Sequence, residues 1–115
     1  MQTKPTIRQI MEELVAVQSD TGTQQEKNAA QKIAAYFAED PYFRAHPDCW
    51  GLADTGDFLG RPVVWALKRG TTDKVLILTG HYDAVEIDCY GDLKPFARKP
   101  QALLDEIQKR RLGTQ

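Results

Sequence analysis

The sequence predicts an α/β fold in which helices pack on a β-sheet, and three observations support this prediction. Apolar residues recur at helical spacing over residues 6–18 and again over 23–40. Residues 49–67 have the composition of a β-hairpin, with a loop rich in glycine and aspartate between two apolar stretches. Residues 75–78 form an unbroken apolar run, which is typical of a strand buried on both faces of a sheet.

The first predicted helix covers residues 6–18 and is amphipathic. Its apolar stripe consists of Ile7, Ile10, Met11, Leu14 and Val17. Charged and amide side chains occupy the opposite face, as in a helix that lies on the surface of a globular domain. We therefore expect the apolar stripe to pack on the sheet.

The second predicted helix follows a turn at residues 19–22. Thr23 and Glu26 form a T-x-x-E pattern, which is the signature of a capping box, and it predicts a helix start at Thr23. The helix has a face dominated by alanine, which permits close approach to a sheet. Asp40 and Pro41 are expected to end it.

A polar connection is predicted at residues 41–48, and the hairpin follows. His46 lies in this connection, and we interpret it as a solvated loop residue. The first strand of the hairpin is expected near residues 49–53. The second begins at Pro62, where a missing N–H is tolerated, and continues through residues 63–67.

The predicted central strand ends in the sequence Gly-His-Tyr-Asp, which contains the candidate site residues His81 and Asp83. In open α/β sheets, ligands bind beyond the carboxyl ends of the strands. A neutral imidazole is a good zinc ligand, and a neighbouring carboxylate commonly fixes its tautomer. Satisfied or exposed histidines are commoner than ligands, but this placement favours a metal role for His81, with Asp83 as its partner.

After Asp83, residues 84–99 are predicted to form a loop at the mouth of the site. Its acidic residues Glu86, Asp88 and Asp92 are interpreted as solvated, since carboxylates prefer solvent. Pro100 is expected to begin the final helix. That helix ends in a basic segment at residues 109–111, where cations complement the helix dipole.

Length and charge exclude several classes of protein. The 115 residues correspond to one domain or part of one, with a modest core expected. A net charge of −1 gives no electrostatic footprint for nucleic acid or an anionic membrane. The sequence contains neither a transmembrane stretch nor a signal peptide, so we expect a cytoplasmic protein in which Cys49 and Cys89 are free thiols.

The order of these parts resembles the N-terminal portion of the dinuclear zinc exopeptidases, the family of glutamate carboxypeptidase, aminoacylase and succinyl-diaminopimelate desuccinylase. The resemblance rests on the Ser-x-x-Gly-Thr turn at residues 19–23, on Glu26 opening an alanine-rich helix, and on the GHYDAV segment at residues 80–85. The longer run from His81 looks most like the arginine-utilisation branch. It implies a three-layer α/β/α sandwich, of which residues 1–115 would be a single, incomplete domain.

By this resemblance, His81 would be a ligand of one of two zinc ions, and Asp83 would have a catalytic or ligand-orienting role. The other ligands and the general-base glutamate of the family have no counterpart in this chain. We therefore expect an N-terminal fragment of a metallopeptidase or amidohydrolase that acts on peptide or N-acyl amino acid bonds, inactive alone and with weak zinc binding at most. The alternative is a non-catalytic α/β binding or assembly module. In either case an exposed sheet edge would favour self-association.

Overall fold

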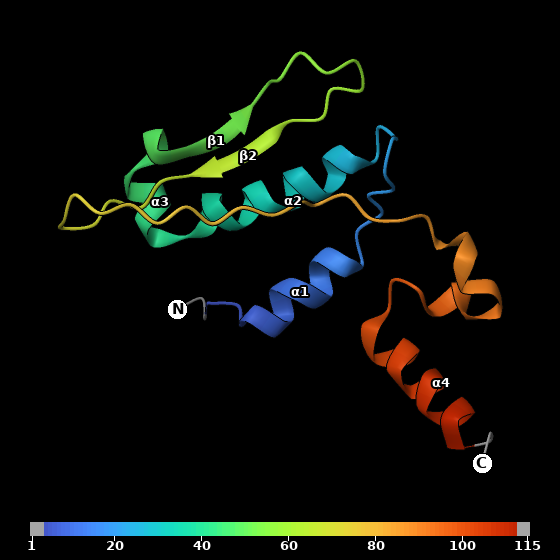
Figure 1. The fold of residues 1–115 in the computed structure, drawn as a ribbon. Helices are drawn as coiled ribbons and strands as arrows, with labels where there is room; N and C mark the ends of the chain where they lie inside the picture. The colour runs from blue at the N-terminus through green and yellow to red at the C-terminus, as the bar shows by residue number, and fades with distance from the viewer. Residues whose placement is uncertain (1–3, 113–115) are drawn as a thin grey trace.

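Helix α2 lies at the centre of the structure, with a β-hairpin on one side and α1 on the other (Figure 1). The computed structural model describes residues 4–112, and side chains up to Arg110. The elements, in chain order, are α1 (Ile7–Val15), α2 (Glu26–Glu39), α3 (Pro41–Ala45), the 3₁₀ turn η1 (Pro47–Cys49), β1 (Trp50–Ala53), β2 (Val63–Ala66), the 3₁₀ segment η2 (Ile87–Phe96) and α4 (Pro100–Leu112). At this level the α/β prediction is confirmed.

The hairpin is an antiparallel pair in which Trp50 lies opposite Ala66 and Ala53 lies opposite Val63. It packs on α2 through the small-residue face of that helix, where Ala29, Ala30 and Ala34 are buried. Small side chains allow the helix backbone to approach the strands closely. The hairpin and the alanine-rich contact face were both predicted correctly.

Helix α1 is capped by Thr6, but it does not lie on the sheet. The Thr6 hydroxyl accepts from the backbone N–H of Gln9 at 3.1 Å, and the Gln9 side chain accepts from the Thr6 N–H at 2.8 Å. This reciprocal capping starts the helix where it was predicted. The helix lies beside α2, with Ile7 and Met11 exposed, so the expectation that its whole stripe packs on the sheet is wrong.

The predicted capping box at Thr23 is also wrong, because α2 begins at Glu26. The Thr23 hydroxyl donates to the carbonyl of Asp20 at 2.7 Å and thereby stabilises the preceding turn. The carboxylate of Glu26 accepts from the N–H of Gly22, a residue with φ of 79°, at 3.1 Å. The two residues therefore stabilise the turn instead of capping the helix.

The predicted connection is mostly helical, since α3 covers residues 41–45 and η1 covers residues 47–49. Asp40 ends α2 and also caps α3, since its carboxylate accepts from the N–H of Tyr42 at 2.9 Å, and Pro41 occupies the first helical position. His46 is exposed, as predicted, and its ring stacks on Tyr42 with ring centroids 4.4 Å apart.

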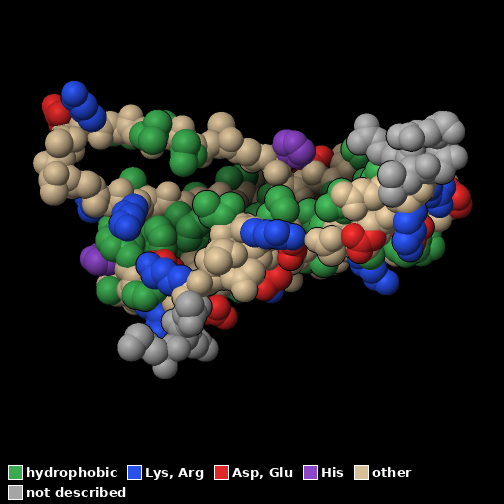
Figure 2. All heavy atoms as spheres, turned by 90° about the horizontal axis from the view of Figure 1, so that it is seen from below, with side chains coloured by type: hydrophobic (Ala, Val, Ile, Leu, Met, Phe, Trp, Pro, Cys, Tyr) green, Lys and Arg blue, Asp and Glu red, His purple; other side chains and the backbone are tan. Residues whose placement is uncertain are grey.

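The predicted central strand is absent from the described residues. Residues 75–78 are 79–86% exposed and belong to no strand. Figure 2 shows this part of the chain as an arch that stands off the rest of the molecule. An extended segment forms a strand only when a neighbour accepts and donates its backbone hydrogen bonds. Among residues 4–112 no strand pairs with this segment.

The segment after Asp83 also differs from the predicted loop, since much of it forms η2. Gly91 breaks this 3₁₀ segment with a φ of 59°. Helix α4 begins at Pro100 as predicted. Asp88 pairs with Lys94 and Asp92 pairs with Arg110 at 2.9 Å, so these acids are exposed but paired. The basic segment extends to Arg111, whose side chain lies outside the described part.

The buried core of residues 4–110 is smaller than the length predicts. Its buried apolar residues are Ala29, Ala30, Ala34, Cys49 and Ala97. The radius of gyration is 17.7 Å, whereas a compact domain of about 100 residues has about 13 Å. Cys49 is buried, Cys89 is exposed, and both are free thiols. No helix in the described range has the length and apolar composition needed to cross a membrane.

Candidate functional site

The two residues of the predicted site contact each other at the end of the exposed arch. The Nδ1 atom of His81 lies 2.9 Å from Oδ1 of Asp83. The His81 side chain is 85% exposed, so the ring projects into solvent instead of being enclosed by aliphatic groups. Asp83 is less exposed and has a second partner, because the Thr21 hydroxyl donates to its Oδ2 atom at 2.9 Å.

The backbone next to this pair is anchored to the turn between α1 and α2. Asp20 and Ala84 form an isolated parallel β-bridge, in which Thr21 N donates to Ala84 O at 2.8 Å and Ala84 N donates to Ser19 O at 2.9 Å. The buried Ser19 hydroxyl donates to the carbonyl of Tyr82 at 3.2 Å. The chain is therefore fixed at residues 82–84, although it is free of pairing at 75–78.

A charged cluster lies beside Asp83 and connects the hairpin loop to the start of α2. Arg61 donates to Asp57 through Nε and Nη2, each at 2.8 Å, and to the buried carboxylate of Glu26 through Nη1 at 2.8 Å. The hydrogen bond from Arg61 is the main reason that the pKa of Asp57 falls to about 2. Arg61 is thus bound by two carboxylates, and we assign it the structural role of joining the hairpin loop to α2.

A shallow cavity of about 390 Å³ lies between this cluster and the anchored segment. Its lining includes Thr21, Glu26, Arg61, Tyr82 and Asp83. The Tyr82 hydroxyl donates to the carbonyl of Pro62 at 2.6 Å, and burial is the main cause of its raised pKa. The hydrogen bond from Thr21 is the main cause of the lowered pKa of Asp83. Asp83 is therefore an ionised group at the rim of a polar hollow.

The residues fit one part of a zinc site but not a complete one. His81 could serve as one zinc ligand, and Asp83 could orient its ring. A catalytic zinc ordinarily takes about three protein ligands. No group of three or more histidine, cysteine, aspartate or glutamate side chains placed to hold a metal occurs in the described part of the chain.

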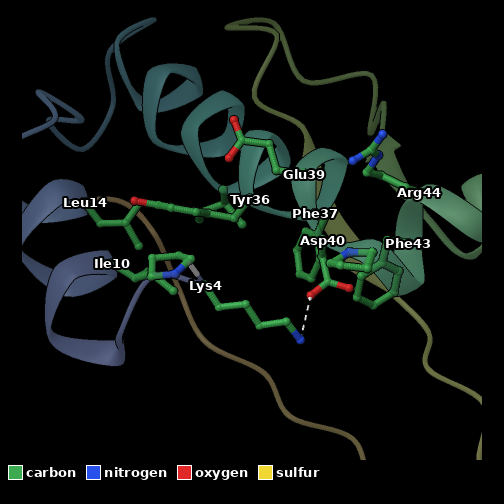
Figure 3. Close-up of a pocket in the computed structure, with 12 residues that line it drawn as sticks. Lys4, Ile10, Leu14, Tyr36, Phe37, Glu39, Asp40, Phe43 and Arg44 are labelled. Atoms are coloured by element: carbon green, nitrogen blue, oxygen red, sulfur yellow. Dashed lines mark ion pairs between the residues drawn. The ribbon is translucent and has the colours of Figure 1, made fainter. Parts of the chain in front are cut away.

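A larger hollow of about 610 Å³ lies elsewhere, between α1, α2 and α3 (Figure 3). Its walls are mainly apolar and include Ile10, Leu14, Phe37 and Phe43, and a Lys4–Asp40 ion pair of 3.9 Å lies at its edge. Its lining contains no histidine, and its ion pair is a long contact at the rim. We therefore interpret it as an incompletely filled contact between helices.

Sequence reasoning singled out His81 and Asp83 but not Thr21, which contacts Asp83, or Arg61, which lines the same cavity. Thr21 and Arg61 were not singled out as site residues, because each contacts the site across a long stretch of sequence. The Thr21–Asp83 contact spans 62 residues and the Arg61–Glu26 contact spans 35. The one available signal was the Ser-x-x-Gly-Thr turn, which is the segment that anchors residues 82–84.

Comparison with known proteins finds a similarity to part of a longer protein. The chain is 33% identical over 111 residues to YqjN, an uncharacterized protein of Bacillus subtilis (strain 168). The match covers 96% of this chain but only 20% of YqjN, so the chain spans about a fifth of the length of this relative. No protein-family model matches the sequence. No solved structure matches it significantly.

Proposed function

We propose that this chain is the N-terminal part of a zinc-dependent metallopeptidase or amidohydrolase that hydrolyses peptide or N-acyl amino acid bonds. In this proposal His81 is a zinc ligand, and Asp83 orients it or takes part in catalysis. The observation that carries the proposal is the 2.9 Å contact between His81 Nδ1 and Asp83 Oδ1, with the rest of the imidazole ring open to solvent. A cytoplasmic location belongs to the same proposal.

The exposed apolar run supports the idea that further chain completes the fold. Four consecutive apolar side chains at 79–86% exposure are costly in water, at roughly 25 cal/mol per Å² of apolar surface. Strands supplied by the remaining four fifths of a protein as long as YqjN would bury them in the proposed three-layer α/β/α sandwich. The same remainder would supply the missing metal ligands.

The isolated chain should lack the activity of the complete enzyme. With one histidine ligand it should bind zinc weakly at most, and it should not hydrolyse peptides or N-acyl amino acids. Measurable zinc-dependent turnover by the purified chain would contradict this statement.

A hybrid protein tests the proposal itself. Residues 1–115 would replace the matching segment of YqjN, and the purified hybrid would be analysed for zinc content and for hydrolysis of dipeptides and N-acyl amino acids. We expect bound zinc and turnover, with both reduced by His81→Ala. Asp83→Asn should reduce turnover by about 10- to 100-fold if Asp83 orients the ligand, since groups that orient a metal ligand commonly contribute that much. A folded hybrid without zinc and without turnover would overturn the proposal.

The alternative proposal is a non-catalytic binding or assembly module. It is favoured by the exposed run at residues 75–78, since unpaired apolar segments associate with other strands. Both proposals expect the isolated chain to form dimers or larger species, so light scattering separates them only in the hybrid with YqjN. A module should still associate there, whereas the enzyme should not, since its sheet would be complete. His81→Ala should leave that association unchanged, in contrast to its effect on zinc binding by the hybrid.

A further inference from the structure

The Thr21 hydroxyl contacts Asp83 on the side opposite to His81. Oδ2 of Asp83 accepts from Thr21 at 2.9 Å, and Oδ1 lies 2.9 Å from Nδ1 of His81. Each carboxylate oxygen therefore has its own partner. We propose that Thr21 is a positioning residue, which orients Asp83 and through it fixes the tautomer of His81.

The hydrogen-bond partners of Thr21 support this assignment. Its hydroxyl hydrogen has two acceptors within reach, Asp83 Oδ2 and the carbonyl of Ala84, both at 2.9 Å. The Ala84 carbonyl already accepts from the Thr21 backbone N–H at 2.8 Å. A hydroxyl carries one hydrogen, and a bond to an ionised carboxylate is stronger than one to a neutral carbonyl. The hydroxyl therefore donates to Asp83.

The consequence for His81 follows from the chemistry of an ionised carboxylate. A carboxylate only accepts hydrogen bonds, so Nδ1 of His81 must carry the hydrogen in the contact with Asp83. In the neutral ring, Nε2 then has the free lone pair. Nδ1 also lies 3.2 Å from the backbone carbonyl of Asp83, a neutral and therefore weaker acceptor of the same hydrogen. Without Thr21, rotation of the Asp83 side chain would no longer hold Oδ1 against Nδ1, and only this weaker contact would favour the Nδ1–H tautomer. Binding of a zinc ion by the free lone pair of Nε2 rests on the proposed function. The effect of Thr21 on the tautomer of His81 does not.

The test is ¹⁵N NMR of histidine-labelled protein at about pH 8.5, where histidine side chains are ordinarily neutral. The ratio of Nδ1–H to Nε2–H tautomer is measured for His81, with His46→Gln used to assign the signals. Thr21→Val keeps the shape of the side chain but removes the donor. We expect it to lower the ratio about threefold or more, since hydrogen bonds to charged groups are among the stronger ones.

Two further variants separate positioning from folding. Thr21→Ser retains the hydroxyl and should keep the tautomer ratio of the unmodified chain. Thr23→Val removes a hydroxyl from the same turn that donates to Asp20 instead of Asp83, and it should also leave the ratio unchanged. An unchanged ratio in Thr21→Val, or an equal fall in Thr23→Val, would overturn the inference.

The outcome is independent of the hybrid experiment. A lowered ratio in Thr21→Val together with a hybrid that lacks zinc would reject the proposed function and retain the positioning role. An unchanged ratio together with an active hybrid would reject the positioning role alone.

Discussion

Strand β2 and the run at residues 75–78 have similar sequences but different structures. Both contain four consecutive apolar residues with β-branched members, VVWA and VLIL. β2 pairs with β1 along its length and packs on α2. Residues 75–78 are exposed and belong to no strand.

The difference shows that the neighbour, not the local sequence, decides whether an apolar run becomes a strand. β1 and β2 are consecutive along the chain and are joined by residues 54–62, so each strand has its pairing partner nearby in sequence. Residues 75–78 would need a partner from outside the described part. We test this comparison with four predictions, beginning with the contacts that join α2 to the hairpin.

The largest expected effect is at Glu26, whose buried carboxylate joins α2 to the hairpin loop. Glu26→Ala removes hydrogen bonds from Arg61 and from the N–H of Gly22. We expect a loss of about 2–3 kcal/mol in the free energy of unfolding, measured by urea denaturation, because hydrogen bonds to charged groups contribute about 1.5–3 kcal/mol each. Glu26→Gln keeps an acceptor and should lose less. Equal losses in the two variants would contradict the assigned role.

The alanine contact between α2 and the hairpin should show the next largest effect. Ala30 is fully buried, so Ala30→Leu should destabilise the protein by about 1–3 kcal/mol through overpacking. Ala35 lies on the same helix but is exposed, and Ala35→Leu should have almost no effect on urea denaturation. A similar loss in both variants would mean that the helix does not pack as described.

A smaller effect is expected from acid, through the pair of Asp57 and Arg61. The pKa of Asp57 is lowered from its ordinary value of 3.8 to about 2 in the folded chain. The stabilisation is therefore present above about pH 4 and is lost as the pH falls towards 2. The difference in melting temperature between the unmodified protein and Asp57→Asn should shrink over this range. A difference that is constant from pH 5 to about pH 2 would exclude this linkage.

The smallest effect should be that of proline in the arch. Ile77→Pro removes a backbone N–H that pairs with no strand here, so the unfolding free energy should change by less than about 0.5 kcal/mol. In the hybrid with YqjN, the same substitution should destabilise the protein markedly, since residues 75–78 would then be part of a sheet. A marked loss in the isolated chain would show that this segment is already paired.

The parts of the fold that were predicted correctly depend on local signals. The hairpin has a loop rich in glycine and aspartate between its two strands, and both α2 and α4 have proline near a boundary. Helix α3 was missed because Asp40 and Pro41 were interpreted only as the end of α2, although an aspartate followed by proline is also a helix start.

In the candidate site too, local signals were visible in the sequence and contacts between distant segments were not. The spacing of His81 and Asp83 is visible in the sequence, and the two side chains do contact each other. The contacts of Thr21 and Arg61 depend on how distant segments come together, which local patterns do not encode. The central strand failed in the same way, since its pairing also requires distant residues.

The exposed arch is the part of the chain that we expect a protease to cleave first. Lys68, Arg69 and Lys74 are exposed in a stretch that lies outside helices and strands, so trypsin should cut there first. The N-terminal product would contain α1, α2, α3 and the complete hairpin. The C-terminal product would stay attached to it through the bridge between Asp20 and Ala84 and the 2.9 Å ion pair of Arg98 with Asp20. The cut therefore separates the backbone that contains the complete hairpin from the backbone that carries His81, while contacts at Asp20 keep the two products together.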